Sequence, residues 1–424
     1  MHLEKAGLLV AMSQDFGISA DEIELIEYGP LMREIDRVIA NLKPWFAQSL
    51  DMSLNSSYLF GLKSSTIFNM PLGTVVVFGS KSDELSTLIY PLIHSIAGGN
   101  YTVLVPESST SATLAFLEFI INKYLSPSKV YIVERDIKIS ELEAVYRKRL
   151  VDMIFDTRGN QASKEMGILA SKHSVRYISN APGLNIAVVD QTCNIKETAK
   201  MISEQKFYKA GQSTDGIDVL YVHSAVQDEF IDELKRNVFY DHSNSGPKSF
   251  QHGKILDSDT LITAEKLAQD LSKSGQMETS YTINHERHQM APLIVTNADK
   301  TLLLQKFSGP ILPVQTFTNL HELLAEINNS TSRDPNLGTF YYFGNSAGMC
   351  EELKGLVSFK QLFYNSTPMN STSIFEPKFG RFSLQGASAS SIFGMHTFTK
   401  QKLLSFQSEP SLKFTSRKPE FSNR

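Results

Sequence analysis

The chain has 424 residues, of which 42% are hydrophobic, and it carries 41 basic against 45 acidic side chains. This length and hydrophobic content are sufficient for a large buried core divided between two domains. A formal net charge of -4 gives no electrostatic support for binding nucleic acid.

Cysteine usage and the absence of targeting segments indicate a soluble, cytoplasmic protein. The two cysteines, Cys193 and Cys350, are too few for a disulfide framework, and neither has the paired spacing of a metal site. No N-terminal run has signal-peptide length, and no stretch reaches the roughly 20 apolar residues of a membrane span. The basic residues from Lys413 onward are interpreted as a solvated tail, flexible at residues 417–424.

The first half of the chain alternates between predicted strands and helices. Residues 74–78 read as a buried strand, and the apolar residues from Leu85 to Ile96 then recur at helical spacing up to Gly98-Gly99, a good C-cap. Further strands are predicted at 101–105, 129–133, 151–155 and 175–178, with helices at about 111–124, 140–150 and 161–173 between them. This alternation predicts a doubly wound parallel sheet.

A second α/β unit is predicted from the strand at residues 185–189 to about residue 365. Inside it, residues 241–253 are polar and contain Gly, Ser and Pro, which favours a surface loop. Two histidines at i, i+3 spacing, His285 and His288, have polar surroundings and no evident third ligand, so we interpret them as part of a surface turn.

Seven short motifs, taken together and in order, resemble one enzyme family. They are Met70-Pro-Leu-Gly-Thr-Val-Val-Val-Phe-Gly79, the segment 96–106, Lys206-Phe-Tyr-Lys-Ala-Gly-Gln212, the segment 291–297, Ser308-Gly-Pro-Ile-Leu-Pro-Val-Gln-Thr-Phe317 with 319–323, Lys378-Phe-Gly380 and Thr397-Phe-Thr-Lys400. The chain is similar to the aldehyde dehydrogenase superfamily, and its closing motifs resemble the class-three, fatty aldehyde dehydrogenase branch.

The resemblance implies a particular domain organisation. It implies an α/β fold with a Rossmann-like cofactor-type domain at residues 1–179 (plus about 376–400) and an α/β catalytic-type domain at 180–375. Residues 53–70 and 400–416 would form a small oligomerisation arm, which implies a homodimer. Membrane-bound fatty aldehyde dehydrogenases carry a C-terminal anchor, whereas this chain ends in polar residues, so no membrane partner is expected.

The catalytic positions implied by the resemblance hold unsuitable residues. Thr214 stands at the family's nucleophilic cysteine, Asn180 at its general-base glutamate and Ser82 at its oxyanion-binding asparagine. A threonine hydroxyl is far less acidic than a thiol and needs an adjacent base. An amide does not accept a proton at neutral pH, and losing one oxyanion donor costs about 100- to 1,000-fold. No intact catalytic residue is therefore expected.

The implied cofactor positions are also altered. Val105 replaces the lysine that binds the adenosine ribose, and Arg158 and Ser163 replace two glycines of the pyrophosphate turn. Lys306, followed by Ser308, replaces the glutamate that binds the nicotinamide ribose. An arginine can pair with phosphate, but its bulk in a turn meant for close backbone approach favours a blocked groove. No cofactor is therefore expected, although NAD or NADP would be the expected cofactor if the protein were an enzyme.

Other residues near these positions favour structural roles. Asp215 and Asp218 suggest a carboxylate pair, but we interpret Asp218 as a strand-entry residue and Asp215 as one that solvates the loop. Gly386-Ala-Ser-Ala-Ser390 has only the first glycine of a nucleophile elbow, which argues against Ser388 as a nucleophile. Cys193 and Cys350 are interpreted as structural cysteines.

Two functional interpretations remain open at this stage. The first is a catalytically silent aldehyde dehydrogenase homologue with a binding or scaffold role and an unidentified protein or small-molecule partner. The second is an enzyme with altered chemistry, such as weak ester hydrolysis through Thr214 or Ser213, or NAD(P)-linked oxidation through another residue. Loss of both the catalytic and the cofactor sets favours the first.

Overall fold

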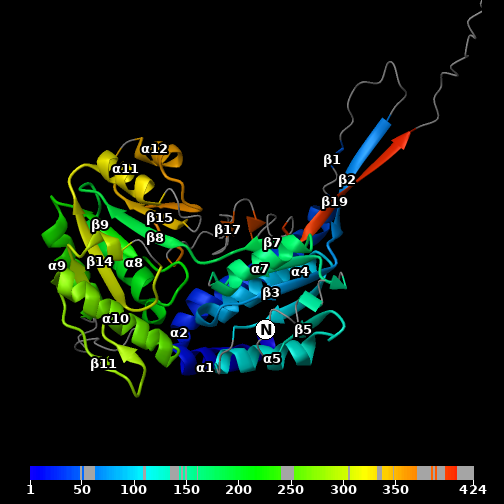
Figure 1. The fold of residues 1–424 in the computed structure, drawn as a ribbon, viewed down its shortest axis with the longest axis horizontal. Coiled ribbons are helices and arrows are strands. Elements are labelled where there is room, and N and C mark those ends of the chain that lie inside the picture. Colours follow the sequence, from blue (N-terminus) through cyan, green and yellow to red (C-terminus); the bar gives the residue numbers. More distant parts are fainter. Residues whose placement is uncertain are drawn as a thin grey trace, which may run out of the picture.

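The computed structural model contains two α/β units and a projecting arm (Figure 1). It describes residues 1–47, 50–51, 63–107, 111–133, 143–144, 147–148, 150–159, 161–239, 253–303, 306–331, 337–346, 348–369, 383–384, 387–388 and 397–407. Within these ranges, residues 47, 50–51, 63–67, 82, 161, 383–384, 387–388 and 403–407 are described by their backbone alone. No described helix is long and apolar enough to cross a bilayer.

The first unit is built on a five-stranded parallel sheet, which confirms the predicted alternation. Its order is β5 (Val130–Ile132), β4 (Tyr101–Val105), β3 (Thr74–Phe78), β6 (Met153–Asp156) and β7 (Arg176–Ser179). The helices between these strands are η3 (Lys81–Asp83), η4 (Leu85–Ile89), α4 (Tyr90–Ala97), α5 (Ala112–Tyr124) and α7 (Gln161–Lys172). Of the predicted helix at 140–150, most lies outside the described residues.

Both faces of this sheet are covered, as a parallel sheet requires. Val75 and Val77 point to one face, where they pack with residues of α4, α5 and the N-terminal helices. Val76 and Phe78 point to the other face and pack against α7. The predicted helix from Leu85 begins as the π-helix η4 before it continues as α4, whose C-cap is Gly98; Gly99 follows with φ +82.

A helical segment, not assigned to elements by the sequence, precedes the first sheet. It contains η1 (His2–Glu4), α1 (Lys5–Phe16), α2 (Ala20–Ile23), the π-helix η2 (Glu24–Tyr28) and α3 (Gly29–Ala47). Asp15, at the end of α1, accepts the backbone N–H groups of Ala112 and Thr113 at 2.8 and 2.7 Å, so it caps α5 from outside. This segment also brings Glu27 to the junction between the two units.

The second unit is built on a seven-stranded sheet that is parallel except for its edge strand β10. Its order is β10 (Gln276–Met277), β13 (Leu293–Thr296), β14 (Ile311–Phe317), β9 (Val219–His223), β8 (Leu184–Val189), β15 (Leu337–Phe343) and β16 (Gln361–Tyr364). Helices α8 (Ile195–Phe207) and α9 (Gln227–Phe239) cover one face, while α10 (Ser258–Ser274), α11 (Leu320–Thr331) and α12 (Met349–Leu356) cover the other. The predicted second unit is therefore confirmed.

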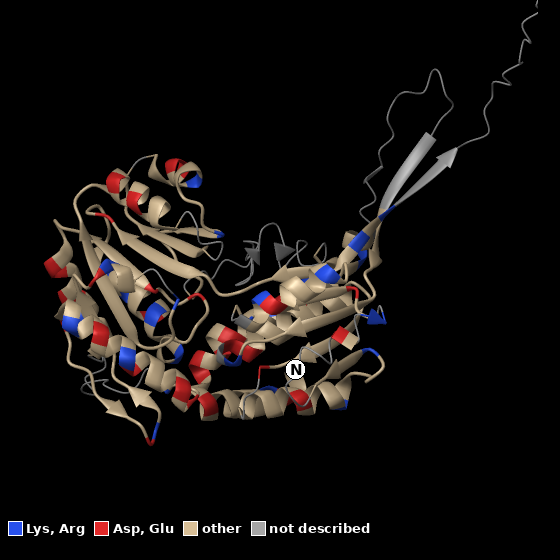
Figure 2. Ribbon diagram, viewed as in Figure 1, with Lys and Arg blue, Asp and Glu red and all other residues tan. Residues whose placement is uncertain are grey.

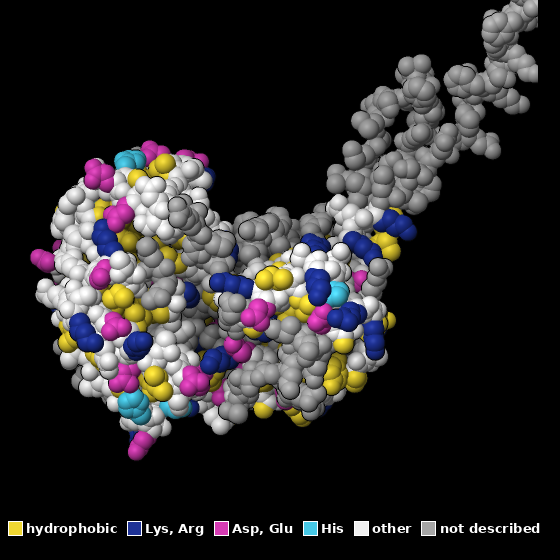
Figure 3. Space-filling view, viewed as in Figure 1, with side chains coloured by type: hydrophobic (Ala, Val, Ile, Leu, Met, Phe, Trp, Pro, Cys, Tyr) yellow, Lys and Arg dark blue, Asp and Glu magenta, His cyan; other side chains and the backbone are white. Residues whose placement is uncertain are grey.

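Smaller elements complete the described part of the chain. These are η5 (Tyr208–Gly211), η6 (Lys300–Leu302), β17 (Ser383–Leu384), β18 (Ala387–Ser388) and the hairpin of β11 (Ile283–Asn284) and β12 (Gln289–Met290). His285 and His288 lie in the turn of this hairpin, as predicted. On the face seen in Figure 3, basic and acidic side chains are interspersed rather than gathered into a field of one sign.

The arm is an antiparallel ribbon of two chain segments far apart in sequence. Strand β2 (Lys63–Pro71) pairs along its length with β19 (Thr399–Gln407), and β1 (Leu50–Asp51) pairs with β2. Residues 52–62, 408–416, the predicted tail at 417–424 and most of 376–400, including the motif at 378–380, lie outside the described residues. The predicted domain boundaries stay predictions.

The arm generates a prediction about assembly. On its outer side, β19 has no partner strand among the described residues, and an exposed strand edge is a template for pairing with another chain. We expect sedimentation equilibrium to give twice the 47.4 kDa chain mass. Leu404→Pro, which removes a strand N–H, should give a monomer with unchanged helical content, while Leu404→Val stays dimeric. A monomeric wild-type protein would contradict this expectation.

Candidate functional site

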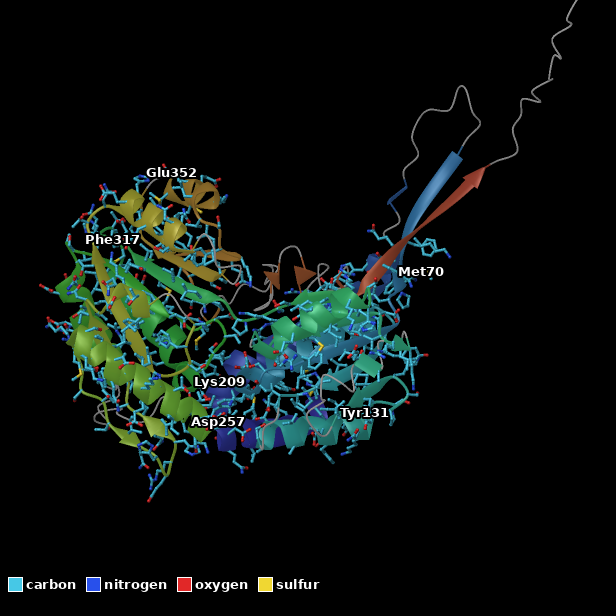
Figure 4. All side chains as sticks on the ribbon, viewed as in Figure 1. Met70, Tyr131, Lys209, Asp257, Phe317 and Glu352 are labelled. Carbon is cyan, nitrogen blue, oxygen red and sulfur yellow. The ribbon has the colours of Figure 1, made fainter. Side chains whose placement is uncertain are left out.

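A polar pocket of about 290 Å³ lies where the two units meet. It is lined by Ser80, Lys81, Glu107, Arg158, Gly159, Pro182, Gln212, Ser213, Thr214, Leu256, Asp257, Thr260, Lys306 and Ser308. The first unit contributes the segments that follow β3, β4 and β6, which is the carboxyl edge where doubly wound sheets bind ligands. Figure 4 places Lys209 and Asp257 at this junction, and Figure 2 shows charges of both signs along it.

Thr214 lies on the loop after η5, and its hydroxyl is already engaged. It is buried, and its Oγ1 donates to Asp83 Oδ2 at 3.3 Å. Asp83, which ends η3, is 1% exposed and its Oδ1 accepts a hydrogen bond from Lys209 Nζ at 3.3 Å. The hydroxyl at the predicted nucleophile position is therefore a donor within the protein.

Lys209 sits at the centre of a buried ion triad formed by Lys209, Asp83 and Glu27. Its ammonium lies 2.7 Å from Glu27 Oε1, and both side chains are 2% exposed or less. The same ammonium lies 4.8 Å from the centroid of the Phe16 ring, at the end of α1. The triad therefore links the N-terminal helices, the β3–η3 segment and the loop that carries Thr214.

The backbone around Lys209 is held in an uncommon conformation. Lys209 and Ala210 both have left-handed φ values, +50 and +53, and Gly211 follows with φ +73. A Cβ on Gly211 would lie 2.0 Å from the carbonyl oxygen of Gly309, so only glycine fits there. Left-handed non-glycine residues persist only where surrounding contacts hold them, and the buried ion triad supplies such contacts.

Lys306 fixes the same loop from the other side. Its Nζ donates to the carbonyl oxygens of Thr214 and Gly216 at 3.1 and 3.2 Å and to Asp218 Oδ2 at 3.1 Å. The three donors of the ammonium are thus matched by three acceptors of the protein. Asn185 Nδ2 donates to the same two carbonyl groups at 2.9 and 2.8 Å.

The surroundings of Lys306 also contain strongly shifted groups. Burial raises the pKa of Asp218, although Lys306 and Lys206 oppose this shift. Burial lowers the pKa of Lys206 to about 7, and the negative charge of Asp218 opposes that shift. The interpretation of Asp218 as a simple strand-entry residue therefore misses its ion pair with Lys306.

Arg158 is likewise paired within the protein. Its Nε and Nη2 donate to the two carboxylate oxygens of Asp156 at 3.0 and 2.7 Å. The guanidinium lies 4.1 Å from the centroid of the Phe78 ring. Ser163, another predicted cofactor position, uses its Oγ to accept the N–H of Gly159 at 3.1 Å. The side chains of Arg158 and Ser163 therefore form hydrogen bonds with neighbouring groups at the turn before α7.

The remaining predicted positions fall in three different places. Ser308 lines the pocket together with Thr214, Arg158 and Lys306. Val105 is a buried core residue of β4 and does not line the pocket. Ser82 lies in η3, and its side chain is outside what the structure describes.

Asn180 does not line the polar pocket with Thr214. A second cavity of about 30 Å³ is lined by both residues together with Asp215 and Lys360. Asn180 is 3% exposed, and its Nδ2 has no hydrogen-bond partner among the described residues. Asp215 is 4% exposed, so the expectation that it solvates the loop is wrong: the loop folds inward because Lys306 and Asn185 bind its carbonyl groups.

The sequence missed Glu27 and Asp83 as members of the site. Asp83 directly follows the predicted oxyanion position Ser82, so its place in the turn was a usable signal. Glu27 offered none, because it reaches Lys209 only through the packing of the N-terminal helices. Among the described residues, no cluster of three or more His, Cys, Asp or Glu side chains could hold a metal ion.

The buried ion triad generates a prediction about stability. Lys209→Met leaves two buried carboxylates without their cation and is expected to lower the free energy of unfolding by about 3–5 kcal/mol. Lys123→Met is the matched control, because it breaks only the solvent-exposed pair with Glu4, at 2.7 Å, and should lower the stability far less than Lys209→Met does. Urea unfolding measures both.

A triple variant separates the charges from the packing. Adding Glu27→Gln and Asp83→Asn to Lys209→Met removes all three charges and should recover most of the lost stability. Equal stability losses in Lys209→Met and Lys123→Met would show that the triad has no structural role.

Comparisons with known proteins agree with this architecture. The family model described as "Aldehyde dehydrogenase family" matches residues 26–335. The chain is 25% identical over 412 residues to a 4,4'-diaponeurosporen-aldehyde dehydrogenase of Staphylococcus aureus, covering 95% of this chain and 86% of that protein. It is 28% identical over 320 residues to a 4,4'-diapolycopene-4,4'-dial dehydrogenase of Cytobacillus firmus, covering 74% and 68%.

Among solved structures, the substrate-bound state of AldH from Staphylococcus aureus superposes with a TM-score of 0.82 at 22% identity. The match covers 97% of this chain and 88% of that one. At this identity the likeness shows the fold, while the family model matches well over half of the chain. The chain therefore belongs to the aldehyde dehydrogenase family.

Proposed function

We propose that this chain is a catalytically silent member of the family, with a binding or scaffold role in place of aldehyde oxidation. One observation carries the proposal: the hydroxyl of Thr214 donates to the carboxylate of Asp83, which is itself held by Lys209, the cation that also pairs with Glu27. A nucleophile must be free to lose its proton toward a base and to add to a carbonyl. Thr214 is instead built into a buried polar network.

The neighbouring groups supply no substitute for the missing chemistry. Asp83 accepts from Thr214, but its negative charge is already engaged with Lys209 in a site closed to water. Asn180, the residue at the family's base position, is an amide and does not take up a proton at neutral pH. These features support a loop that is stabilised for structure and not arranged for turnover.

The residues around the polar pocket fit an NAD or NADP pyrophosphate poorly. Arg158, which stands where the backbone would approach the phosphates, is bound to Asp156 by two hydrogen bonds. Lys306 is saturated by two loop carbonyls and Asp218. Because neither cation is available to an anion, we propose that no dinucleotide cofactor is bound.

A hydrolase with altered chemistry is the second candidate, favoured by the hydrogen bond from Thr214 to Asp83. Such an enzyme would cleave activated esters through the threonine oxygen. The isosteric Thr214→Val variant distinguishes it, with Ser213→Ala as the control for the neighbouring hydroxyl. We expect wild type and both variants to hydrolyse 4-nitrophenyl acetate at the same background rate. A rate that Thr214→Val alone abolishes would favour the hydrolase.

Restoration of the nucleophile is the sharper test of the silent-homologue proposal. We expect neither wild type nor Thr214→Cys to oxidise short or fatty aldehydes with NAD or NADP above background. The double variant Thr214→Cys with Asn180→Glu should also stay inactive, because groups that act as one catalytic unit are strongly non-additive and the cofactor positions are still altered. The assay is nicotinamide reduction followed at its absorbance maximum.

Labelling provides the control for that experiment. Iodoacetamide modification of the introduced cysteine, beyond that of Cys193 and Cys350, shows that the new thiol is present and accessible. Appreciable NAD-dependent oxidation by the single cysteine variant would mean that the groove still binds cofactor productively, and the proposal would fail.

The assembly implied by the resemblance forms part of the same proposal. We propose a homodimer that forms through the β2–β19 arm and leaves the polar pocket between the two units of each chain. A protein partner or a small-molecule ligand then recognises the retained fold, with no part for nucleic acid or a membrane surface.

A further inference from the structure

The polar pocket between the two units is rich in hydroxyl groups. Four of its lining residues, Ser80, Ser213, Thr260 and Ser308, carry hydroxyls in addition to Thr214. Its apolar side chains are those of Pro182 and Leu256 alone among the lining residues. A pocket of this composition offers a ligand many hydrogen-bonding groups.

The charges of the pocket are balanced internally. Lys81 lies 2.7 Å from Asp257 and Arg158 lies 2.7 Å from Asp156. Lys306 lies 3.1 Å from Asp218, and Glu107 adds one more carboxylate to the lining. Among the described residues, the three cations of the lining are thus each paired with a carboxylate, two of which, Asp156 and Asp218, are buried behind the lining. Because no cation is left without its counter-charge, an anionic ligand gains little net attraction.

The described part of the pocket offers no surface on which a nucleobase could stack. None of the described lining residues is aromatic, and the nearby Phe78 ring is covered by the guanidinium of Arg158. Its volume of about 290 Å³ lies at the lower end of the roughly 300–1,000 Å³ range of ligand pockets. Size and lining both point to a small ligand without an aromatic group.

We propose that this pocket binds a small, uncharged polyhydroxy molecule of the monosaccharide or sugar-alcohol class. The carboxylates of Asp257 and Glu107 line the pocket as acceptors for ligand hydroxyls, and the ammonium of Lys81 lines it as a donor. Paired charges of this kind offer donors and acceptors together without selecting a charged ligand. The inference rests on the proposed function, because it gives the ligand class of a silent binding protein.

Calorimetric titration with matched neutral and anionic sugars tests the proposal. The neutral probes are glucose, ribose, sorbitol and glycerol, and the anionic probes are gluconate, glucuronate and a glucose phosphate monoester, each at millimolar concentration. We expect saturable binding of at least one neutral probe, at an affinity at least about tenfold above that of its anionic counterparts. Saturation excludes the general stabilisation that polyols exert at high concentration.

Two conservative variants test the role of the carboxylates. Asp257→Asn retains the helix cap of α10, where the Asp257 side chain accepts from Thr260 N at 2.8 Å, but removes a charge from the pocket. Glu107→Gln also removes a charge from the pocket and keeps an oxygen that can accept the N–H of Lys81, which Glu107 accepts at 3.0 Å. Both should reduce the preference for neutral over anionic probes by about tenfold. Asp299→Asn changes the N-cap of η6, away from the pocket, and should leave the preference for neutral probes unchanged.

The outcomes separate the ligand class from the proposed function. Absence of saturable binding by every neutral probe, equal or tighter binding of the anionic probes, or no effect of either pocket variant would overturn the ligand class. Aldehyde oxidation measured on the same preparations reports on catalytic silence independently. If the protein binds no neutral sugar and oxidises no aldehyde, only the proposed ligand class is refuted. If it oxidises aldehydes, the proposed function is refuted.

Discussion

The buried contact between Lys209 and the carboxylates of Glu27 and Asp83 is the constraint on which the site depends. It joins three parts of the chain that are distant in sequence: the N-terminal helices, the segment after β3 and the loop after η5. Since Asp83 also accepts the Thr214 hydroxyl, the position of the loop and the state of that hydroxyl are set by one network. Lys306 then holds the carbonyl side of the same loop.

A buried ion cluster of this kind is a poor source of net stability, and we expect its main effect to be on which conformation the loop adopts. Removing charges from water costs several kcal/mol per ion, and the attraction between them repays this only when all partners are present. The arrangement therefore penalises any conformation in which the loop leaves Lys209 or Asp83.

The sequence predicted the architecture well because the strands carry a local signal. Thr74–Phe78 and Tyr101–Val105 were placed by their β-branched, apolar runs, and Gly98-Gly99 marked the end of the intervening helix. The π-helical start of that helix and the N-terminal helices were not predicted, since their form depends on packing against the sheet.

Within the site, the family resemblance singled out four residues that line one pocket, namely Thr214, Arg158, Lys306 and Ser308. It did not predict the side chains with which they form hydrogen bonds and ion pairs. Asp156 lies two residues before Arg158, so that pair had a local signal. Glu27 and Asp218 had none, because their pairs form only in the folded chain. Asp215 was misjudged because the inward turn of its loop follows from Lys306 and Asn185, which come from other elements.

We propose that the internal pairing of Arg158 and Lys306 leaves a nucleotide without the cations that would bind its phosphates. Isothermal titration of the purified protein with NAD and with NADP measures this directly. We predict no saturable heat for either nucleotide up to millimolar concentration, at low salt where anion binding is strongest. Saturable micromolar binding of NAD or NADP would contradict the proposed loss of cofactor binding and would favour an NAD(P)-dependent enzyme.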